Sequence, residues 1–310
     1  MTDSMNTAKA AAAAASYRPP RNQWWDVWDQ FRTHKGAMFG MFVFTALIAL
    51  VVLGPWLWDA NPTLTNMRMR NKPMSWEFPL GTDQLGRDIL ARVIAGGKTT
   101  LAVGLTAMCL SITLGATIGI CAGFFRRADN ILMRITDLFL ALPLLPLLLL
   151  MVMLFREPLV QNFGPELGIF LLIVTAIALT SWMNTARIVR GEVLTIKERE
   201  FVLAARSIGT PARRIILRHI LPSVLSPVMV AATLGIANAV ITESALSFLG
   251  LGFPPDFPTW GRLLQDGMPY INLYPSRVLW PALALSSLVL SVNYIGDGLR
   301  DALDPRIRGR

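Results

Sequence analysis

Length, composition and charge together indicate a membrane protein. The chain has 310 residues, of which 53% are hydrophobic and only 16% are charged. This balance lies far from that of an ordinary soluble domain, and it leaves no room for a separate soluble enzyme domain. The net charge of +9 is a topology signal, because basic residues flank the apolar blocks, so it does not call for a nucleic-acid partner.

The N-terminal part is predicted to consist of a tail and a short helix. Residues 1–22, which include the low-complexity run TAKAAAAAASYRPP, are predicted to be a disordered cytoplasmic tail. Residues 23–35 are predicted to form an interfacial amphipathic helix. Four apolar residues share one face of it: Trp24, Val27, Trp28 and Phe31. Such a helix lies in the membrane interface, where Trp is favoured, or packs against the bundle, and these interpretations are compatible.

Six uncharged runs follow, each about as long as the roughly 20 residues that a helix needs to cross a bilayer. They are residues 36–58, 99–125, 138–155, 167–186, 219–242 and 278–296. The predicted fold class is therefore an all-α membrane protein with six transmembrane helices. The first transmembrane helix, residues 36–58, is interpreted as a retained anchor, because its apolar run exceeds the roughly 7–15 residues of a signal-peptide core.

Basic residues predict an N-in, C-in topology. Most of the 29 Lys and Arg residues fall in the tail, in the turns after the second and fourth runs, and in the C-terminal tail, residues 300–310. These segments are cytoplasmic if the N-terminus is inside. Residues 59–98 then form a periplasmic loop, although this loop is also basic. Its last part, GRDILARVIAGGKTT, is a candidate for a helix that lies on the membrane surface.

The sequence contains no cluster typical of catalysis or metal binding. Cys109 and Cys121 fall on different turns of one predicted helix, and the two histidines are far apart. The GKT triplet at 97–99 resembles the end of a phosphate-binding loop, but Arg92 stands where the first glycine of that loop is required. We therefore expect that the chain is not an enzyme and that it binds no cofactor or metal itself.

The stretch EREFVLAARSIGTPARRIILRHILP, within the cytoplasmic segment 187–222, is predicted to form two short helices. Apolar and small residues share one face of the first helix: Phe201, Ala204, Ala205 and Ile208. Gly209 is predicted to end it, Thr210 and Pro211 to start the second helix, and Pro222 to end that one. Either this hairpin offers a shallow surface to another protein's groove, or it is an ordinary loop whose charges only fix topology.

The hairpin resembles the "EAA" loop of ABC importer permeases. That pattern is Glu-Ala-Ala, three residues, Gly, nine residues, Ile, any residue, and Leu-Pro. The residues at matching positions are Ala204, Ala205, Gly209, Leu221 and Pro222. Leu203 and His219 stand at the Glu and Ile places, and Glu200, one turn earlier, is the candidate acidic group. The resemblance implies that this loop is a coupling helix seated in a partner ATPase.

Three further segments are similar to segments of the C-type permease subunit of dipeptide and oligopeptide ABC importers. They are PLGTDQLGRDILARVIAGGKTTL, SALSFLGLGFPPDFPTWGRLLQDG and GDGLRDALDPR. The resemblance extends from about residue 31 to the C-terminus. It implies a MetI-like permease fold whose core spans residues 99–299, in a multi-pass protein of the bacterial inner membrane.

The same resemblance implies the partners. A homologous second permease subunit, two cytoplasmic ATPase subunits that bind ATP and Mg, a periplasmic or lipid-anchored substrate-binding protein, and membrane lipids are expected. The implied function is uptake of di- or oligopeptides. Alternatives are import of another solute such as glutathione or nickel, and, with less support, a secondary transporter. A secondary transporter would be expected to show paired ionisable residues or broken-helix repeats at mid-membrane, and the sequence shows no internal repeat.

Polar residues near the end of the fifth run are candidates for a translocation path. Asn238, Thr242 and Glu243 lie close together in sequence, and they either contact the transported solute or form hydrogen bonds between helices. Asp137, at the edge of the third run, is expected near Arg134 in a structural role.

Overall fold

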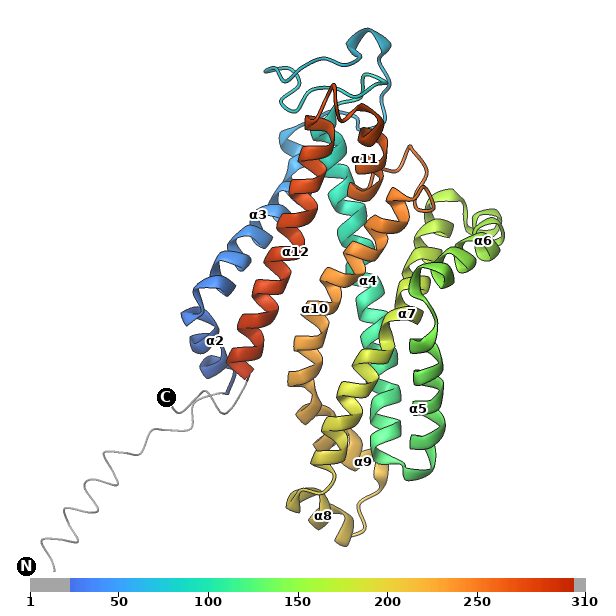
Figure 1. Ribbon diagram of the computed structural model, residues 1–310. Helices are drawn as coiled ribbons and strands as arrows, with labels where there is room; N and C mark the ends of the chain where they lie inside the picture. Colours follow the sequence, from blue (N-terminus) through green and yellow to red (C-terminus); the bar gives the residue numbers. More distant parts are fainter. Residues whose placement is uncertain (1–22, 304–310) are drawn as a thin grey trace, which may run out of the picture.

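The computed structural model describes residues 23–303 of the chain, and the regular elements in that range are helices. The predicted tail at residues 1–22, and the part of the predicted C-terminal tail beyond residue 303, lie outside the described residues. A single isolated bridge joins Thr82 to Asp88. The architecture is a bundle of long helices (Figure 1), which confirms the all-α prediction.

Among residues 23–303, six helices are long and apolar enough to cross a membrane. They are α3 (Lys35–Leu57), α4 (Ile89–Phe124), α6 (Leu144–Phe163), α7 (Pro165–Ile196), α10 (Leu221–Phe248) and α12 (Ser276–Leu303). The expected number of spans is therefore confirmed, and each lies near one of the apolar runs in the sequence.

Short helices occupy the two ends of the bundle. They are α2 (Gln23–Thr33), η1 (Met67–Met69), α5 (Arg126–Ala141), α8 (Glu200–Ser207), α9 (Ala212–Ile215), η2 (Ile216–Ile220), α11 (Trp260–Gly267) and η3 (Met268–Tyr270). Figure 1 shows α2, the end of α12 and the α8–α9 pair at one end, which we call the hairpin end. The opposite end carries α11 and the connection between α3 and α4, and we call it the loop end.

The second spanning helix starts earlier than its apolar run. Asp88 caps α4, because its carboxylate accepts hydrogen bonds from the N–H groups of Leu90 at 2.8 Å and Ala91 at 3.4 Å. The loop predicted for residues 59–98 consequently ends at Asp88. The stretch GRDILARVIAGGKTT does not form a separate helix on the surface; its residues from Ile89 onwards are the first turns of α4.

The third apolar run, residues 138–155, is divided between two helices. Helix α5 ends at Ala141, Leu142 and Pro143 are extended, and α6 starts at Leu144. The physical reason is the proline ring, which disfavours helical backbone at the residue before it. The span therefore lies later in the sequence than its run, and α5 is a separate helix whose first residues are basic.

Helix α2 packs against the bundle through the predicted apolar face. Val27 and Phe31 are buried in a cluster with Ala37 of α3 and Ala302 of α12. Trp28, which was predicted to lie on that face, is instead 43% exposed. Packing accounts for one side of α2, and the proposal that its other side lies in the membrane interface stays a prediction.

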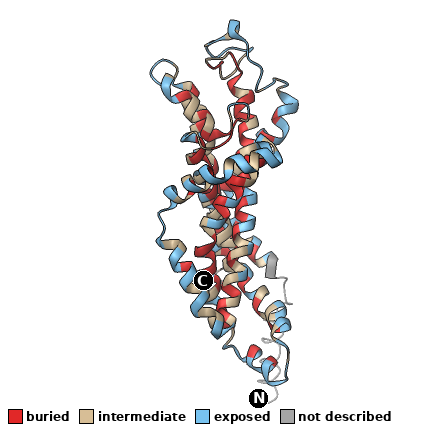
Figure 2. Cartoon of the chain, turned by 90° about the vertical axis from the view of Figure 1, so that its right-hand side faces the viewer, coloured by how far each residue is buried: buried red, intermediate tan, exposed pale blue. Residues whose placement is uncertain are grey.

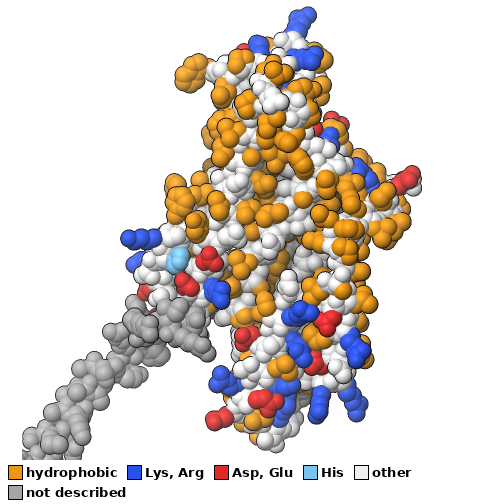
Figure 3. Space-filling model, viewed as in Figure 1, with side chains coloured by type: hydrophobic (Ala, Val, Ile, Leu, Met, Phe, Trp, Pro, Cys, Tyr) orange, Lys and Arg blue, Asp and Glu red, His pale blue; other side chains and the backbone are white. Residues whose placement is uncertain are grey.

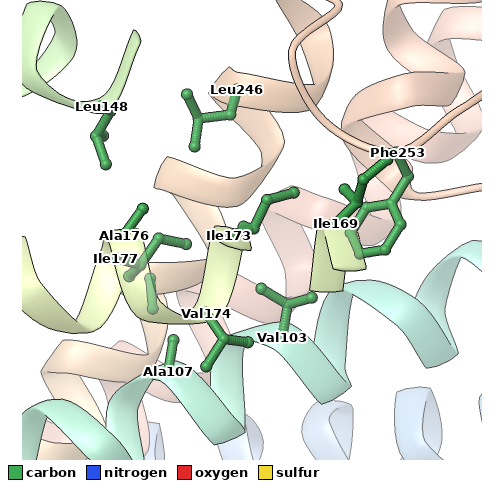
Figure 4. Packing of buried hydrophobic residues seen from close by; sticks show 11 residues of the cluster. Val103, Ala107, Leu148, Ile169, Ile173, Val174, Ala176, Ile177, Leu246 and Phe253 are labelled. Carbon is green, nitrogen blue, oxygen red and sulfur yellow. The ribbon is translucent and has the colours of Figure 1, made fainter. Parts of the chain in front are cut away.

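The core lies where α4 meets α7, which have the most extensive contact in the bundle. Buried residues follow the long axis of the molecule (Figure 2), and Val103 and Ala107 of α4 share a cluster with Ile173 and Ile177 of α7 (Figure 4). Further along, three α4 glycines face α7 at intervals of four residues: Gly115, Gly119 and Gly123. Small residues at this spacing let two helix backbones approach closely within a membrane.

The surface separates apolar from basic side chains. In the view of Figure 3, hydrophobic side chains cover the middle and upper parts of the bundle, and Lys and Arg gather at the hairpin end. An apolar band with basic residues beyond it is typical of a membrane-spanning bundle.

Replacing one glycine of the α4–α7 contact is expected to destabilise the protein. A Cβ atom at Gly119 would lie 2.6 Å from the Ala186 carbonyl oxygen and 2.8 Å from the Val189 Cβ, so the backbones would have to separate. We expect Gly119→Ala to lower the free energy of unfolding by about 1–3 kcal/mol, measured by thermal unfolding in detergent. Gly191→Ala is the matched control, since a Cβ at Gly191 meets nothing within 4 Å. Equal unfolding temperatures for the two variants would contradict the role of the glycine contact.

Candidate functional site

The predicted hairpin is present at the hairpin end, between α7 and α10 (Figure 1). Helix α7 continues to Ile196, so the connection outside the long helices is shorter than the predicted segment 187–222. Gly209 has a φ of +75°, a left-handed conformation that glycine adopts without strain. Gly209 lies in the turn after α8 and directs the chain into α9.

The start of the second helix differs from the prediction by one position. Pro211 is extended and precedes the first helical residue, Ala212, so Thr210 is not its cap. The helix also does not end at Pro222. The intervening segment η2 is a π-helix in which the Leu221 N–H donates to the Ile216 carbonyl. This wider turn lets the chain continue into α10 although Pro222 has no N–H to donate.

The residues predicted to share one face of α8 differ in burial. Ala205 is buried together with Val202, and both lie in a cluster with residues of α7 and α10. Phe201, Ala204 and Ile208 are exposed instead, Ile208 by 82%. The four residues predicted to share one face are therefore divided between the bundle and the surface. Ala205 anchors α8 to the bundle, and the other three residues form an exposed apolar strip, which we call the α8 strip.

Glu200 and Pro222 do not meet in the structure of the hairpin. Glu200 is exposed in the first turn of α8 and makes no ion pair within the described residues, and Pro222 is exposed at the start of α10. The Glu200 carboxylate is therefore accessible on the same short helix that carries the α8 strip.

Ion pairs attach the hairpin end of α7 to its neighbours. Arg190 donates two hydrogen bonds to Asp129 of α5, at 2.5 and 2.8 Å. This hydrogen bonding holds the pKa of the Asp129 carboxyl below its usual range. Asp137 pairs with Arg187 at 2.5 Å, not with Arg134 as expected. Lys197, where α7 ends, donates to the Gly123 carbonyl of α4 at 3.0 Å.

The three candidate path residues do not form one site. Asn238 is exposed, and Thr242 donates a hydrogen bond to its carbonyl at 2.8 Å. Glu243 has no exposed surface and accepts hydrogen bonds from Ser247 at 2.7 Å and Thr100 of α4 at 3.2 Å. Glu243 thus lies inside the bundle, where it links α10 to α4, while Asn238 lies on the surface of α10.

The loop end contains a buried ionic network that the sequence analysis did not detect. Asp83 contacts both Arg87 and Arg92 at 2.7 Å, and Asp266 of α11 lies 3.2 Å from Arg92 and 3.7 Å from Arg87. The side chains of Asp83, Arg87 and Arg92 are each less than a tenth exposed. The spacing of four between Asp83 and Arg87 was the available signal, but these arginines were interpreted only as topology charges.

This network joins the connection after α3 to α4, α11 and α12. Arg277 of α12 donates to the side chain of Asn71 at 2.5 Å and to the Thr82 carbonyl at 3.2 Å. The Trp260 indole of α11 donates to the Val93 carbonyl of α4 at 2.9 Å. Burial by itself raises the pKa of the Asp83 carboxyl, but hydrogen bonds and charge from Arg87 and the charge of Arg92 outweigh it and lower the pKa.

The described residues include no group of three or more His, Cys, Asp or Glu side chains able to hold a metal ion. The geometry does not assemble a nucleophile with a base either. What it offers is an exposed hairpin at one end, a rigid network at the other, and a core of closely packed spanning helices between them.

Two family descriptions match the chain. Residues 111–309 match the family described as "Binding-protein-dependent transport system inner membrane component". Residues 22–73 match the family described as "N-terminal TM domain of oligopeptide transport permease C". Together they leave residues 1–21, residues 74–110, which include the first turns of α4, and residue 310 without a match.

Curated proteins match the chain over nearly its full length. It is 37% identical to the oligopeptide transport system permease protein OppC of Bacillus subtilis, over 97% of this chain and 95% of that protein. It is also 37% identical to the dipeptide transport system permease protein DppC of the same organism, over 98% and 92%. Among solved structures, the MetNI methionine ABC transporter in an inward-facing conformation is similar in fold. There the TM-score is 0.56 at 18% identity, over 69% of this chain and 97% of that one.

Removing the charge of Asp83 is expected to destabilise the loop end. Asp83→Asn leaves two buried guanidinium groups without their shared carboxylate, and breaking a buried pair in this way costs about 3–5 kcal/mol. We expect a lower unfolding temperature in detergent. Asp59→Asn, at an exposed residue that makes no ion pair within the described part of the chain, is the matched control and should have no effect. Equal stability of both variants would contradict the role assigned to the network.

The lowered pKa of Asp83 also predicts a direction of pH dependence. A carboxyl whose folded-state pKa lies below its usual value of 3.8 stabilises the fold above that pH, and this contribution is lost as the pH falls through the folded-state pKa. Unfolding temperatures measured from pH 7 down to about pH 3 should therefore decline less steeply for Asp83→Asn than for the wild-type protein. Parallel curves would refute this assignment.

Proposed function

The chain belongs to the family of binding-protein-dependent transport system inner membrane components, and from this premise we propose that it is the permease subunit of an ATP-driven importer of di- or oligopeptides. The observation that carries the proposal is the similarity, over nearly the whole chain, to oligopeptide and dipeptide transport permeases. The chain is a multi-pass protein of the bacterial inner membrane, and as a permease subunit it is not an enzyme.

In the proposed transporter, ATP is bound and hydrolysed by other chains. Two cytoplasmic ATPase subunits bind and hydrolyse ATP with Mg, a homologous second permease completes the path, and a periplasmic or lipid-anchored binding protein delivers the peptide. The hairpin end faces the cytoplasm in this arrangement, in agreement with the basic residues gathered there. Both termini then lie on the cytoplasmic side.

Helix α8 is the proposed contact with an ATPase. The α8 strip supplies an exposed apolar surface in which Ala204 leaves room for a partner groove, and Glu200, on the same short helix, supplies the acidic group. Ala205 faces the bundle, so it holds α8 in place and does not touch the partner. Gly209 shapes the turn between α8 and α9, and Pro222 lies in the first turn of α10.

Movement of α8 would reach the spanning helices through packed side chains. The cluster that holds Val202 and Ala205 also contains Val193 of α7 and Val224 of α10. Closure of the ATPases on ATP would therefore displace α7 and α10 together, and hydrolysis would reverse the displacement. ATP can favour one conformation only to the extent that the ATPases contact α8 differently in the two states.

Of the three candidate path residues, we retain Asn238 and Thr242 and give Glu243 a different role. Asn238 and Thr242 are accessible enough on α10 to contact a solute if the second permease covers that face. Glu243 is enclosed and hydrogen-bonded to Thr100 and Ser247. We therefore propose that it holds α10 against α4 and does not contact the solute.

Reconstitution tests the function as a whole. The tagged chain should co-purify from its native membranes with a second permease and with ATPases, and liposomes that contain this complex and the binding protein should take up labelled dipeptide when ATP is supplied. Competition with glutathione or with Ni²⁺ would identify another solute. Uptake driven by an ion gradient, by a complex without ATPases, would instead support a secondary transporter.

A charge within the α8 strip is expected to uncouple transport from ATP. Ala204→Glu would place an unpaired carboxylate in an apolar contact, where burial of an unpaired charge is costly. We expect at least a tenfold loss of ATP-driven uptake, roughly equivalent to 1.4 kcal/mol, together with less co-purified ATPase. The exposed position of Ala204 means that the chain itself should still fold and insert.

The matched control adds the same charge elsewhere at the hairpin end. Asn130 is exposed on α5, which packs against α4 and α7, so Asn130→Glu should leave both uptake and ATPase recovery unchanged. Normal uptake by a properly inserted Ala204→Glu variant would exclude the α8 strip as the coupling surface.

A further inference from the structure

A large cavity opens at the loop end, in a part of the chain to which neither the coupling surface nor the proposed path residues belong. Its volume is about 700 Å³, within the roughly 300–1,000 Å³ typical of small-ligand sites. One face of α4 forms its floor, with Ala95, Thr99 and Ala102 at helical spacing. The α6–α7 turn and the proline-rich segment that precedes α11 form its walls.

Three charged side chains line this cavity. Lys98 projects from α4, Glu166 from the first turn of α7, and Asp256 from the segment before α11. All three are exposed, and within residues 23–303 none of them makes an ion pair. The cavity thus presents one cationic and two anionic groups, none of which is neutralised by an ion pair within the described residues. A cavity with charges of both signs selects for a ligand that carries both signs as well.

Apolar side chains also line this cavity. Four aromatic side chains belong to the lining: Phe163, Phe170, Phe253 and Phe257. Phe253 is only 2% exposed and packs with Ile169 and Val103 in the core cluster (Figure 4). Aromatic walls with a few charged groups are the usual composition of small-molecule sites, where the apolar part binds side chains and the polar groups orient the ligand.

The wall that carries Asp256 is held in place by the buried ionic network. The Pro255 carbonyl accepts hydrogen bonds from both Arg87 and Arg92, each at 3.5 Å. On the other side of Asp256, Phe257 packs against the core cluster. The segment is therefore fastened at two points, so the cavity exists before any ligand enters. A preformed site loses little conformational entropy on binding.

We propose that this cavity is a binding site for short zwitterionic peptides, in which Lys98 attracts the terminal carboxylate and Glu166 and Asp256 attract the terminal ammonium group. Peptides with apolar side chains fit best because four aromatic side chains line the same cavity. The proposal rests on the proposed function as a peptide importer and assigns a recognition site to this chain itself. The cavity opens at the end away from α8, so it receives the peptide as it enters the permease.

Photo-crosslinking in the complete importer tests the proposal. Leu167 lines the cavity and is half exposed, so p-azidophenylalanine in its place puts a photoreactive group at the ligand without removing a charge. The probe is radiolabelled alanyl-phenylalanine, supplied with the binding protein and ATP to liposomes that contain the whole complex. We expect peptide attached to this chain. The same amino acid in place of Leu273, which is 74% exposed but lies outside the cavity lining, should give no peptide product.

The charge variants test how the peptide is recognised. Lys98→Gln should lower the peptide crosslink roughly tenfold, because a hydrogen bond to a charged group is lost, and Lys98→Arg should restore most of it. Glu166→Gln combined with Asp256→Asn should lower it as well, and should diminish the preference for the free peptide over its N-acetylated form. Lys72→Gln removes a lysine at the same end but outside the cavity and should have no effect.

The outcomes separate this inference from the function on which it rests. Normal ATP-driven uptake without a peptide crosslink at Leu167, or with a crosslink that none of the charge variants changes, overturns the cavity proposal and leaves the importer intact. A crosslink to the binding protein or to the second permease in place of the peptide overturns it too, since the cavity is then a protein contact. Absence of peptide uptake by a fully assembled complex overturns both proposals.

Discussion

The close contact between α4 and its neighbours is the constraint on which the rest of the bundle depends. Three glycines bring α4 against α7, Gly104 faces Val240 of α10, and Gly97 faces Val51 of α3. Lipid chains are as apolar as leucine, so in a membrane the attraction between helices comes from packing and hydrogen bonding, not from burial away from water. A helix with small residues on several sides can contact several partners at once, which is why α4 occupies the centre.

The loop end follows a different principle, because it is held by charge. Asp83, Arg87, Arg92 and Asp266 are enclosed together, and their desolvation is tolerable only because each charge has partners. The same guanidinium groups reach the Pro255 carbonyl, so the network that fixes the connection after α3 also fixes a wall of the cavity. Stability and the proposed recognition site therefore share residues at this end of the molecule.

Periodicity, run length and glycine signals were enough to predict six spanning helices and the hairpin, because these depend on local sequence. The boundaries were less predictable. Capping by Asp88 extended α4, and Pro143 divided the third run, although both residues carry signals that a closer analysis of caps and prolines can use. Which residues of α8 face the bundle was not predictable, since that depends on the positions of α7 and α10. The ionic network joins residues more than 150 positions apart, and no local pattern reveals such a pairing.

The ion pairs at the two ends of the bundle differ in their access to water. Their strength should therefore depend on ionic strength to different degrees. At the hairpin end the Arg187–Asp137 side chains are 51% and 60% exposed, whereas those of Asp83 and Arg92 are 7% and 2% exposed. Dissolved ions screen exposed charges over about 8 Å at cellular concentrations but reach enclosed ones far less. We therefore expect added salt to weaken the Arg187–Asp137 attachment of α5 to α7 more than it weakens the enclosed network at the loop end.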